Sequence, residues 1–131
     1  MVIVVTGASG MVGSQIVLAL IEAGMGPVRG LYRSAASLQS ARRSWEFQGF
    51  AARWSEVEWV RADLEDPTDV ESALEGADYA VHAAALVSFR KKDEHLMLRG
   101  TPLLVEHMVN AALHQGLKGL IHISYKSIKT Y

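Results

Sequence analysis

The chain has 131 residues, with 13 lysines and arginines against 14 aspartates and glutamates, so its formal charge is -1. This length fits one domain with one core, and the near-neutral charge argues against nucleic-acid binding and against a basic membrane anchor. The absence of cysteine excludes disulfides, thiolate metal sites and a cysteine nucleophile. The sequence shows no bilayer-spanning apolar stretch and no signal peptide, and we expect a cytoplasmic protein.

Strand and helix patterns alternate along the chain. Residues 1–6 form an apolar run typical of a strand buried on both faces, and after a glycine-rich turn an amphipathic helix runs to Gly24. Asp66 and Pro67 are typical of a helix start, as the cap and the first helical residue. The later elements follow in order: strand 28–33, a helix and loop in 34–53, strand 56–60, helix 66–76, strand 79–85, helix 94–114 and strand 120–124.

This alternation, with short connections, predicts an α/β fold: a Rossmann-type, doubly wound parallel sheet. We expect about five strands in the order 3-2-1-4-5, and we treat residues 1–131 as one NAD(P)-binding domain.

The turn after the first strand has the spacing G-x-x-G-x-x-G. Gly7 permits a tight turn, Gly10 lets the backbone approach a pyrophosphate, and Gly13 lets the helix pack closely on the strand. Amides at the helix start would then hold the phosphates. The alternative is a loop that only turns the chain. The predicted cofactor-binding residues of this segment are Gly7, Ala8, Ser9, Gly10, Met11, Val12 and Gly13.

The end of the second strand bears on which dinucleotide binds. A site for NAD usually has an acidic residue there, which holds the ribose hydroxyls. This sequence has Arg33 and Ser34 instead, with no carboxylate beside them. Arg33 can pair with a 2′-phosphate and Ser34 can add a hydroxyl, which favours NADP over NAD. The alternative for Arg33 is a solvated surface residue.

Four stretches carry a family resemblance: VTGASGMVGSQIV, VRGLYR, EWVRADLEDPTDVESALEGADYAVHAAALVSF and NAALHQGLKGLIHIS. In order and spacing they resemble the first half of an extended short-chain dehydrogenase/reductase. The superfamily is that of NAD-dependent epimerases and dehydratases, and the subgroup is the dihydroflavonol reductase-like and 3β-hydroxysteroid dehydrogenase-like one. The resemblance implies hydride transfer at a hydroxyl or carbonyl carbon. Other possibilities are a non-catalytic dinucleotide-binding or redox-sensing module, or an inactive fragment.

The resemblance also implies roles for individual residues. Asp63 and Leu64 would hold the adenine, and Ser88 would border the substrate pocket. Three alanines would let the backbone approach the nicotinamide ribose and pyrophosphate. A turn-capping aspartate and core-packing alanines are the alternatives. The three alanines are Ala83, Ala84 and Ala85.

The catalytic residues of the family match this sequence poorly. The family has a serine or threonine after the fifth strand, for which Ser124 is the candidate, and a Tyr-x-x-x-Lys on a later helix. Tyr125 to Lys129 spells that motif directly after the strand, and we reject it because no separate helix intervenes. The family's later strands and substrate domain are absent from residues 1–131. We therefore expect an open edge at the fifth strand, which a homo-oligomer would cover.

The histidines and tryptophans have structural explanations. No metal-ligand spacing is present, so we expect no metal site. His82 and His122 lie on inner strands and are expected to be hydrogen-bonded core residues. Three tryptophans are expected to pack under a loop, because no basic groove accompanies them. They are Trp45, Trp54 and Trp59.

Overall fold

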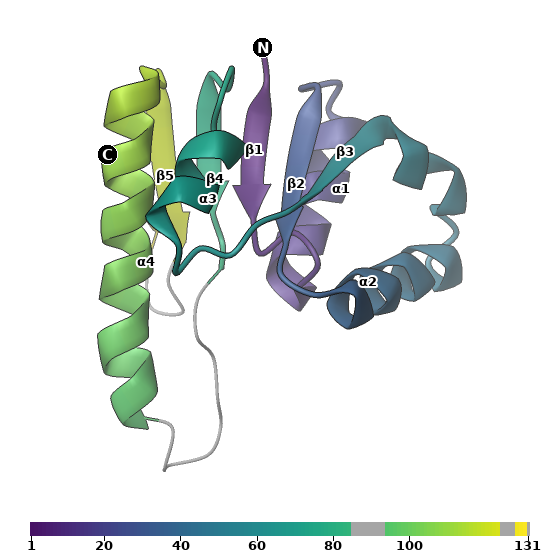
Figure 1. Ribbon diagram of the computed structural model, residues 1–131. Helices are drawn as coiled ribbons and strands as arrows, with labels where there is room; N and C mark the ends of the chain where they lie inside the picture. The colour runs from purple at the N-terminus through teal and green to yellow at the C-terminus, as the bar shows by residue number, and fades with distance from the viewer. Residues whose placement is uncertain (85–93, 124–127, 131) are drawn as a thin grey trace.

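The computed structural model describes residues 1–84, 94–123 and 128–130. They form one mixed sheet with helices on both faces (Figure 1). The strands lie in the order β3-β2-β1-β4-β5-β6, and the first five of these are parallel. The predicted order of five parallel strands is therefore confirmed. The elements are β1 (Ile3–Thr6), α1 (Met11–Glu22), β2 (Val28–Tyr32), α2 (Ala35–Phe47), the 3-10 helix η1 (Ala51–Glu56), β3 (Val57–Arg61), α3 (Pro67–Ala73), β4 (Tyr79–His82), α4 (Glu94–Gln115), β5 (Gly119–Ile123) and β6 (Ile128–Thr130).

The sixth strand was not predicted. β6 runs antiparallel to β5, with Ile128 opposite Ile123 and Thr130 opposite Ile121. Three residues are too few to show a period-2 pattern, so the sequence carries no clear signal for this strand. The prediction of an open edge at β5 is wrong, because β6 pairs with it. An open β5 edge therefore no longer supports an oligomer. Lys129 lies in a strand, in agreement with our rejection of a helical Tyr-x-x-x-Lys motif.

The centre of the sheet is β1, which pairs with β2 on one side and with β4 on the other. All four of its residues are buried, because helices cover both faces. In Figure 1, α3 and α4 lie on one side of the sheet and α1 lies on the other. Val4 packs toward α3 and α4, whereas Val5 packs toward α1. This alternation is the normal side-chain geometry of a strand.

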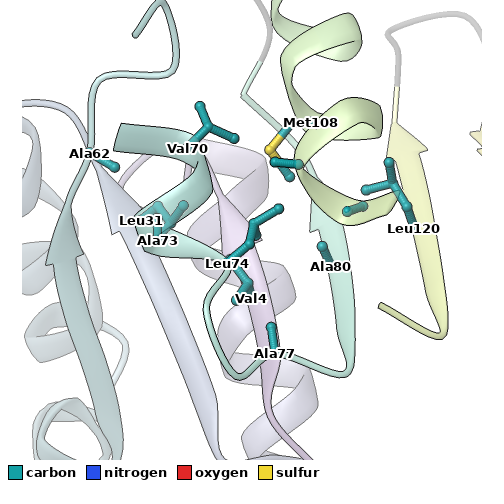
Figure 2. Close-up of a cluster of buried hydrophobic side chains, with 12 residues drawn as sticks. Val4, Leu31, Ala62, Val70, Ala73, Leu74, Ala77, Ala80, Met108 and Leu120 are labelled. Carbon is teal, nitrogen blue, oxygen red and sulfur yellow. The ribbon is translucent and has the colours of Figure 1, made fainter. Parts of the chain in front are cut away.

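The core on the α3 and α4 face is aliphatic (Figure 2). Leu74 of the α3 segment and Met108 of α4 point toward Val4 and Leu120 of the strands, and all four side chains are buried. Asp66 caps α3 by accepting a hydrogen bond from the amide of Thr68 at 2.9 Å, as the sequence predicts. This face therefore holds the loop between β3 and α3 in place.

The core on the other face contains the three tryptophans. Trp45 is fully buried and meets Trp54 and Trp59 edge to face, at ring-centroid distances of 5.2 and 5.9 Å. Trp54 and Trp59 stack at 4.2 Å. A Cβ atom at Gly30 would lie 2.9 Å from the Trp59 ring and 3.0 Å from the Ala8 side chain. The prediction that the tryptophans pack against one another inside the protein is confirmed. Through Gly30, the cluster packs close to Ala8 of the glycine-rich turn.

Candidate functional site

The glycine-rich turn connects β1 to α1 at the carboxyl edge of the sheet. Gly7 has a φ of +62°, and a Cβ atom on it would lie 2.8 Å from the Cα atom of Ala84. A Cβ atom at Gly13 would lie 1.9 Å from the carbonyl oxygen of Gly7, so the start of α1 presses on the turn itself rather than on the strand. The fold therefore requires both glycines. Gly10 differs, because among the described residues only the Gly7 oxygen, at 3.2 Å, would meet its Cβ atom.

The first turn of α1 presents backbone amides. Gly10 is the N-cap and provides no side-chain cap, and Ser14 donates the first intrahelical bond, to the Gly10 carbonyl at 3.0 Å. The amides of the three preceding residues, Met11, Val12 and Gly13, therefore have no carbonyl partner within the helix. The first turn contains no acidic residue, so the helix dipole is not offset there.

Four of the predicted loop residues do not line the pocket with their side chains. Met11 is 88% exposed and Val12 is 55% exposed. Ala8 is fully buried, and its amide donates to the Leu31 carbonyl at 3.0 Å. Ala8 therefore ties the loop to β2 and has no amide left for a phosphate. Gly13 is buried beneath the turn.

A pocket of about 330 Å³ opens between the turn and the ends of β2, β3 and β4. It brings together residues that are up to 97 positions apart in the sequence. Those predicted as site residues are Gly7, Ser9, Gly10, Arg33, Ser34, Asp63, Leu64, Ala83 and Ala84; those that the sequence analysis missed are Leu31, Tyr32, Ser37, Ala62, Glu65 and Leu104. Ala85, Ser88 and Ser124 lie outside the described residues.

A chain of hydroxyls joins the glycine-rich turn to the start of α2. Ser9 lies 2.9 Å from Ser37, whose hydroxyl donates to the Ser34 carbonyl at 2.9 Å. The Ser34 hydroxyl accepts a hydrogen bond from the Ser37 amide at 3.2 Å, and it therefore caps α2. The Ser34 hydroxyl, which we expected to contact a phosphate, thus caps α2 and also donates a hydrogen bond to the Ser37 hydroxyl at 3.2 Å. The Ser34-x-x-Ser37 spacing at the helix start was the available signal for Ser37.

The loop after β3 forms the second wall of the pocket. Oδ1 of Asp63 accepts a hydrogen bond from the Glu65 amide at 3.0 Å, so the turn-capping alternative for Asp63 is present in the structure. Its Oδ2 has no partner among the described residues. His107 of α4 donates from Nδ1 to the Leu64 carbonyl at 2.7 Å and fixes this loop against α4. Sequence reasoning missed that bond, because it joins residues 43 positions apart.

Thr6 organises the third wall. Its hydroxyl oxygen accepts hydrogen bonds from the amides of Ala83 and Ala84, at 3.1 and 3.2 Å. We therefore assign its hydrogen to Nδ1 of His82, which lies 2.7 Å away. The prediction of a hydrogen-bonded core histidine is confirmed for His82. These bonds hold the two alanines against Gly7.

His82 is a buried histidine that stays neutral. Burial is the main cause that lowers its pKa from 6.5 to about 4, and His122 adds to the effect. The two rings stack with centroids 5.3 Å apart. His82 is 1% exposed and His122 is 7% exposed, so neither is a surface group. The pair supports the end of β4 rather than offering a proton to the pocket.

Comparison with known proteins gives consistent results. A family model described as "NAD dependent epimerase/dehydratase family" matches residues 3–128. Dihydroflavonol 4-reductase of Hordeum vulgare is 35% identical over 91 residues, which are 70% of this chain and 25% of that protein. Sterol demethylase protein B of Methylococcus capsulatus is 29% identical over 124 residues, or 95% of this chain and 34% of that protein.

Solved structures show the same arrangement. The crystal structure of UDP-glucuronic acid 4-epimerase from Bacillus cereus in complex with NAD is 26% identical, with a TM-score of 0.69, over 95% of this chain and 40% of that one. The chain thus spans a quarter to a third of the length of the two curated relatives. Within the described residues, no helix is both long enough and apolar enough to cross a membrane.

Proposed function

The chain belongs to the NAD-dependent epimerase/dehydratase family, and from this premise we propose that it binds NADP, or more weakly NAD, in the pocket beside the glycine-rich turn. The observation that carries the proposal is the difference among the three glycines. Gly7 and Gly13 are required by the packing of the protein, whereas Gly10 faces the pocket and has only one close neighbour. An open backbone position at a helix start is what a pyrophosphate needs.

The pocket walls suit the remaining parts of a dinucleotide. The pyrophosphate would lie on the first-turn amides of α1, which have no carbonyl partner within the helix. The adenine would lie between Leu31 and the Asp63–Leu64 loop, where an apolar wall meets a carboxylate oxygen without a partner. The nicotinamide half would pass along the Ala83–Ala84 backbone, which Thr6 holds in place.

The preference for NADP rests on the end of β2. Arg33 lies at the rim of the pocket, and residues 31–34 at the end of β2 contain no acidic residue that would accept bonds from a ribose diol. Guanidinium groups bind phosphate with strong, charge-assisted hydrogen bonds. We therefore expect Arg33→Ala to weaken NADP binding far more than NAD binding.

We also propose the reaction class of the family, hydride transfer at a carbon that bears a hydroxyl or carbonyl group. The nicotinamide, when bound, supplies or accepts the hydride. The contribution of the described residues is to bind and orient the dinucleotide. Ser124 as the catalytic contact and Ser88 as the substrate contact stay predictions.

Calorimetric titration with NADP and NAD tests the binding proposal. Gly10→Ala should weaken both dinucleotides at least tenfold, because its methyl group occupies the space of the pyrophosphate, while the free energy of unfolding stays nearly constant. Gly119→Ala is the matched control: its Cβ atom would meet the Tyr79 ring at 3.2 Å, at the opposite end of the sheet, and binding should be unchanged. A folded wild-type chain that binds neither dinucleotide would refute the proposal. Turnover of NADPH with simple ketones tests the reaction class.

A further inference from the structure

Two arginines lie side by side where β2 and β3 end. Arg33 follows β2, and Arg61 is the last residue of β3, opposite Tyr32 in the parallel register. Nε of Arg61 donates to the carbonyl oxygen of Arg33 at 3.3 Å. This bond holds the Arg61 guanidinium next to the residue that we assign to the 2′-phosphate. Both arginines line one hollow at the rim of the pocket, together with Ser34, Asp63 and Asp69.

Neither of these two arginines forms an ion pair with a described side chain. Three other arginines pair with glutamates at 3.1 to 3.8 Å, at positions Arg29–Glu58, Arg42–Glu46 and Arg53–Glu56. Within residues 1–84 and 103–123, by contrast, no carboxylate comes within 4.0 Å of the guanidinium nitrogens of Arg33 or Arg61. Two adjacent guanidinium groups repel each other, and an anion that bridges them relieves this repulsion.

The two carboxylates that line the hollow accept hydrogen bonds from backbone amides rather than from the arginines. Asp69 Oδ2 accepts a hydrogen bond from the Asp63 amide at 3.1 Å, and Asp63 Oδ1 accepts one from the Glu65 amide. These bonds tie both carboxylates to the backbone of the loop between β3 and α3. Their negative charge still opposes the binding of an anion in the hollow. We therefore expect the two arginines to favour NADP over NAD by tens of fold rather than by thousands of fold.

We propose that Arg61 is a second specificity-determining residue, which binds the 2′-phosphate of NADP together with Arg33. The inference rests on the proposed function, because it assigns a further residue to the same site. The start of α2 lies at the same position, capped by Ser34 and with no acidic residue in its first turn. The helix dipole therefore adds to the positive potential of the two arginines.

Dissociation constants for NADP and NAD, measured for the wild type and Arg61→Gln at two salt concentrations, test this assignment. Arg61→Gln should weaken NADP about tenfold, change NAD less than twofold, and reduce the salt dependence of NADP binding. Arg42→Gln removes the same charge from an exposed arginine of α2 and is the matched control, with no change expected for either dinucleotide.

A second variant separates direct contact from an effect through Arg33. In an Arg33→Ala background, Arg61→Gln should still weaken NADP severalfold. No further loss there would show that Arg61 acts only by positioning Arg33, and equal losses of NADP and NAD would show a general effect on the pocket; either result overturns the assignment. An unchanged NADP affinity in Arg61→Gln would overturn the assignment of Arg61 but not the proposed function. A wild type that binds neither dinucleotide would overturn both.

Discussion

Acid should destabilise this fold through His82. The imidazole is 1% exposed, and its Nδ1 accepts the Thr6 hydroxyl hydrogen. Its Nε2 has no hydrogen-bond partner within the described residues, so protonation gains no bond that would offset the burial of a charge. Burial, and then the neighbouring His122, lower the pKa from 6.5 to about 4.

The size of the effect follows from linkage between proton binding and folding. Since the folded-state pKa lies below the unfolded-state value, the unfolded chain binds more protons between pH 6.5 and about 4. Stability is therefore greatest above pH 6.5 and falls as the pH decreases through this window. The full loss from His82 is about 3 kcal/mol below pH 4, and about 2 kcal/mol is already lost at pH 5.

Urea unfolding at pH 7.5 and pH 5.0 measures this loss. His82→Asn is the comparison, because its Oδ1 can accept the Thr6 hydroxyl hydrogen but cannot be protonated. The two proteins share every other ionisable group, so the difference between them isolates His82. We expect the wild type to lose about 2 kcal/mol more than the variant between these pH values. Equal losses in the two proteins would refute the assignment of His82 as a buried neutral group.

Three further substitutions probe the core and the pocket walls. Leu74→Ala should lower the free energy of unfolding by about 2 to 5 kcal/mol in a urea titration, because Leu74 is fully buried; a loss below 1 kcal/mol would contradict the packing. Gly13→Ala should lower the free energy of unfolding by at least about 1 to 3 kcal/mol and should also abolish dinucleotide binding in calorimetry. A stable variant that still binds would disprove the close contact with Gly7. His107→Leu should weaken binding of the adenine end, measured with 5′-AMP, whereas His107→Asn should retain most of it; equal losses would rule out the bond to Leu64.

Local patterns predicted much of the fold. The apolar run before Gly7 identified the central strand, and the Asp66-Pro67 pair identified the start of α3. Parallel strands joined by right-handed helical connections permit few arrangements, and the glycine-rich turn after the first strand favoured the order 3-2-1-4-5 among them. The glycine spacing placed the turn at the carboxyl edge of the sheet, where the structure has the pocket.

Other features had no local signal. β6 is too short to show a period, and its pairing with β5 depends on where the intervening chain returns. The sequence singled out Arg33 by its place after the second strand, but not Arg61, because an arginine at a strand end is ordinarily a solvated surface residue. The sequence analysis missed that Ser34 caps α2, and its contact with a phosphate stays a prediction.

The order of elements, the glycine turn and the caps could be predicted from local patterns, because each depends on the backbone preferences of a few neighbouring residues. The pairing of distant polar groups depends on how the chain packs: Thr6 meets His82, His107 meets Leu64, and Arg61 meets Arg33. Those bonds join residues 28 to 76 positions apart. They form only when strand register and helix packing bring the atoms within about 3 Å, and no periodicity within a segment encodes that distance.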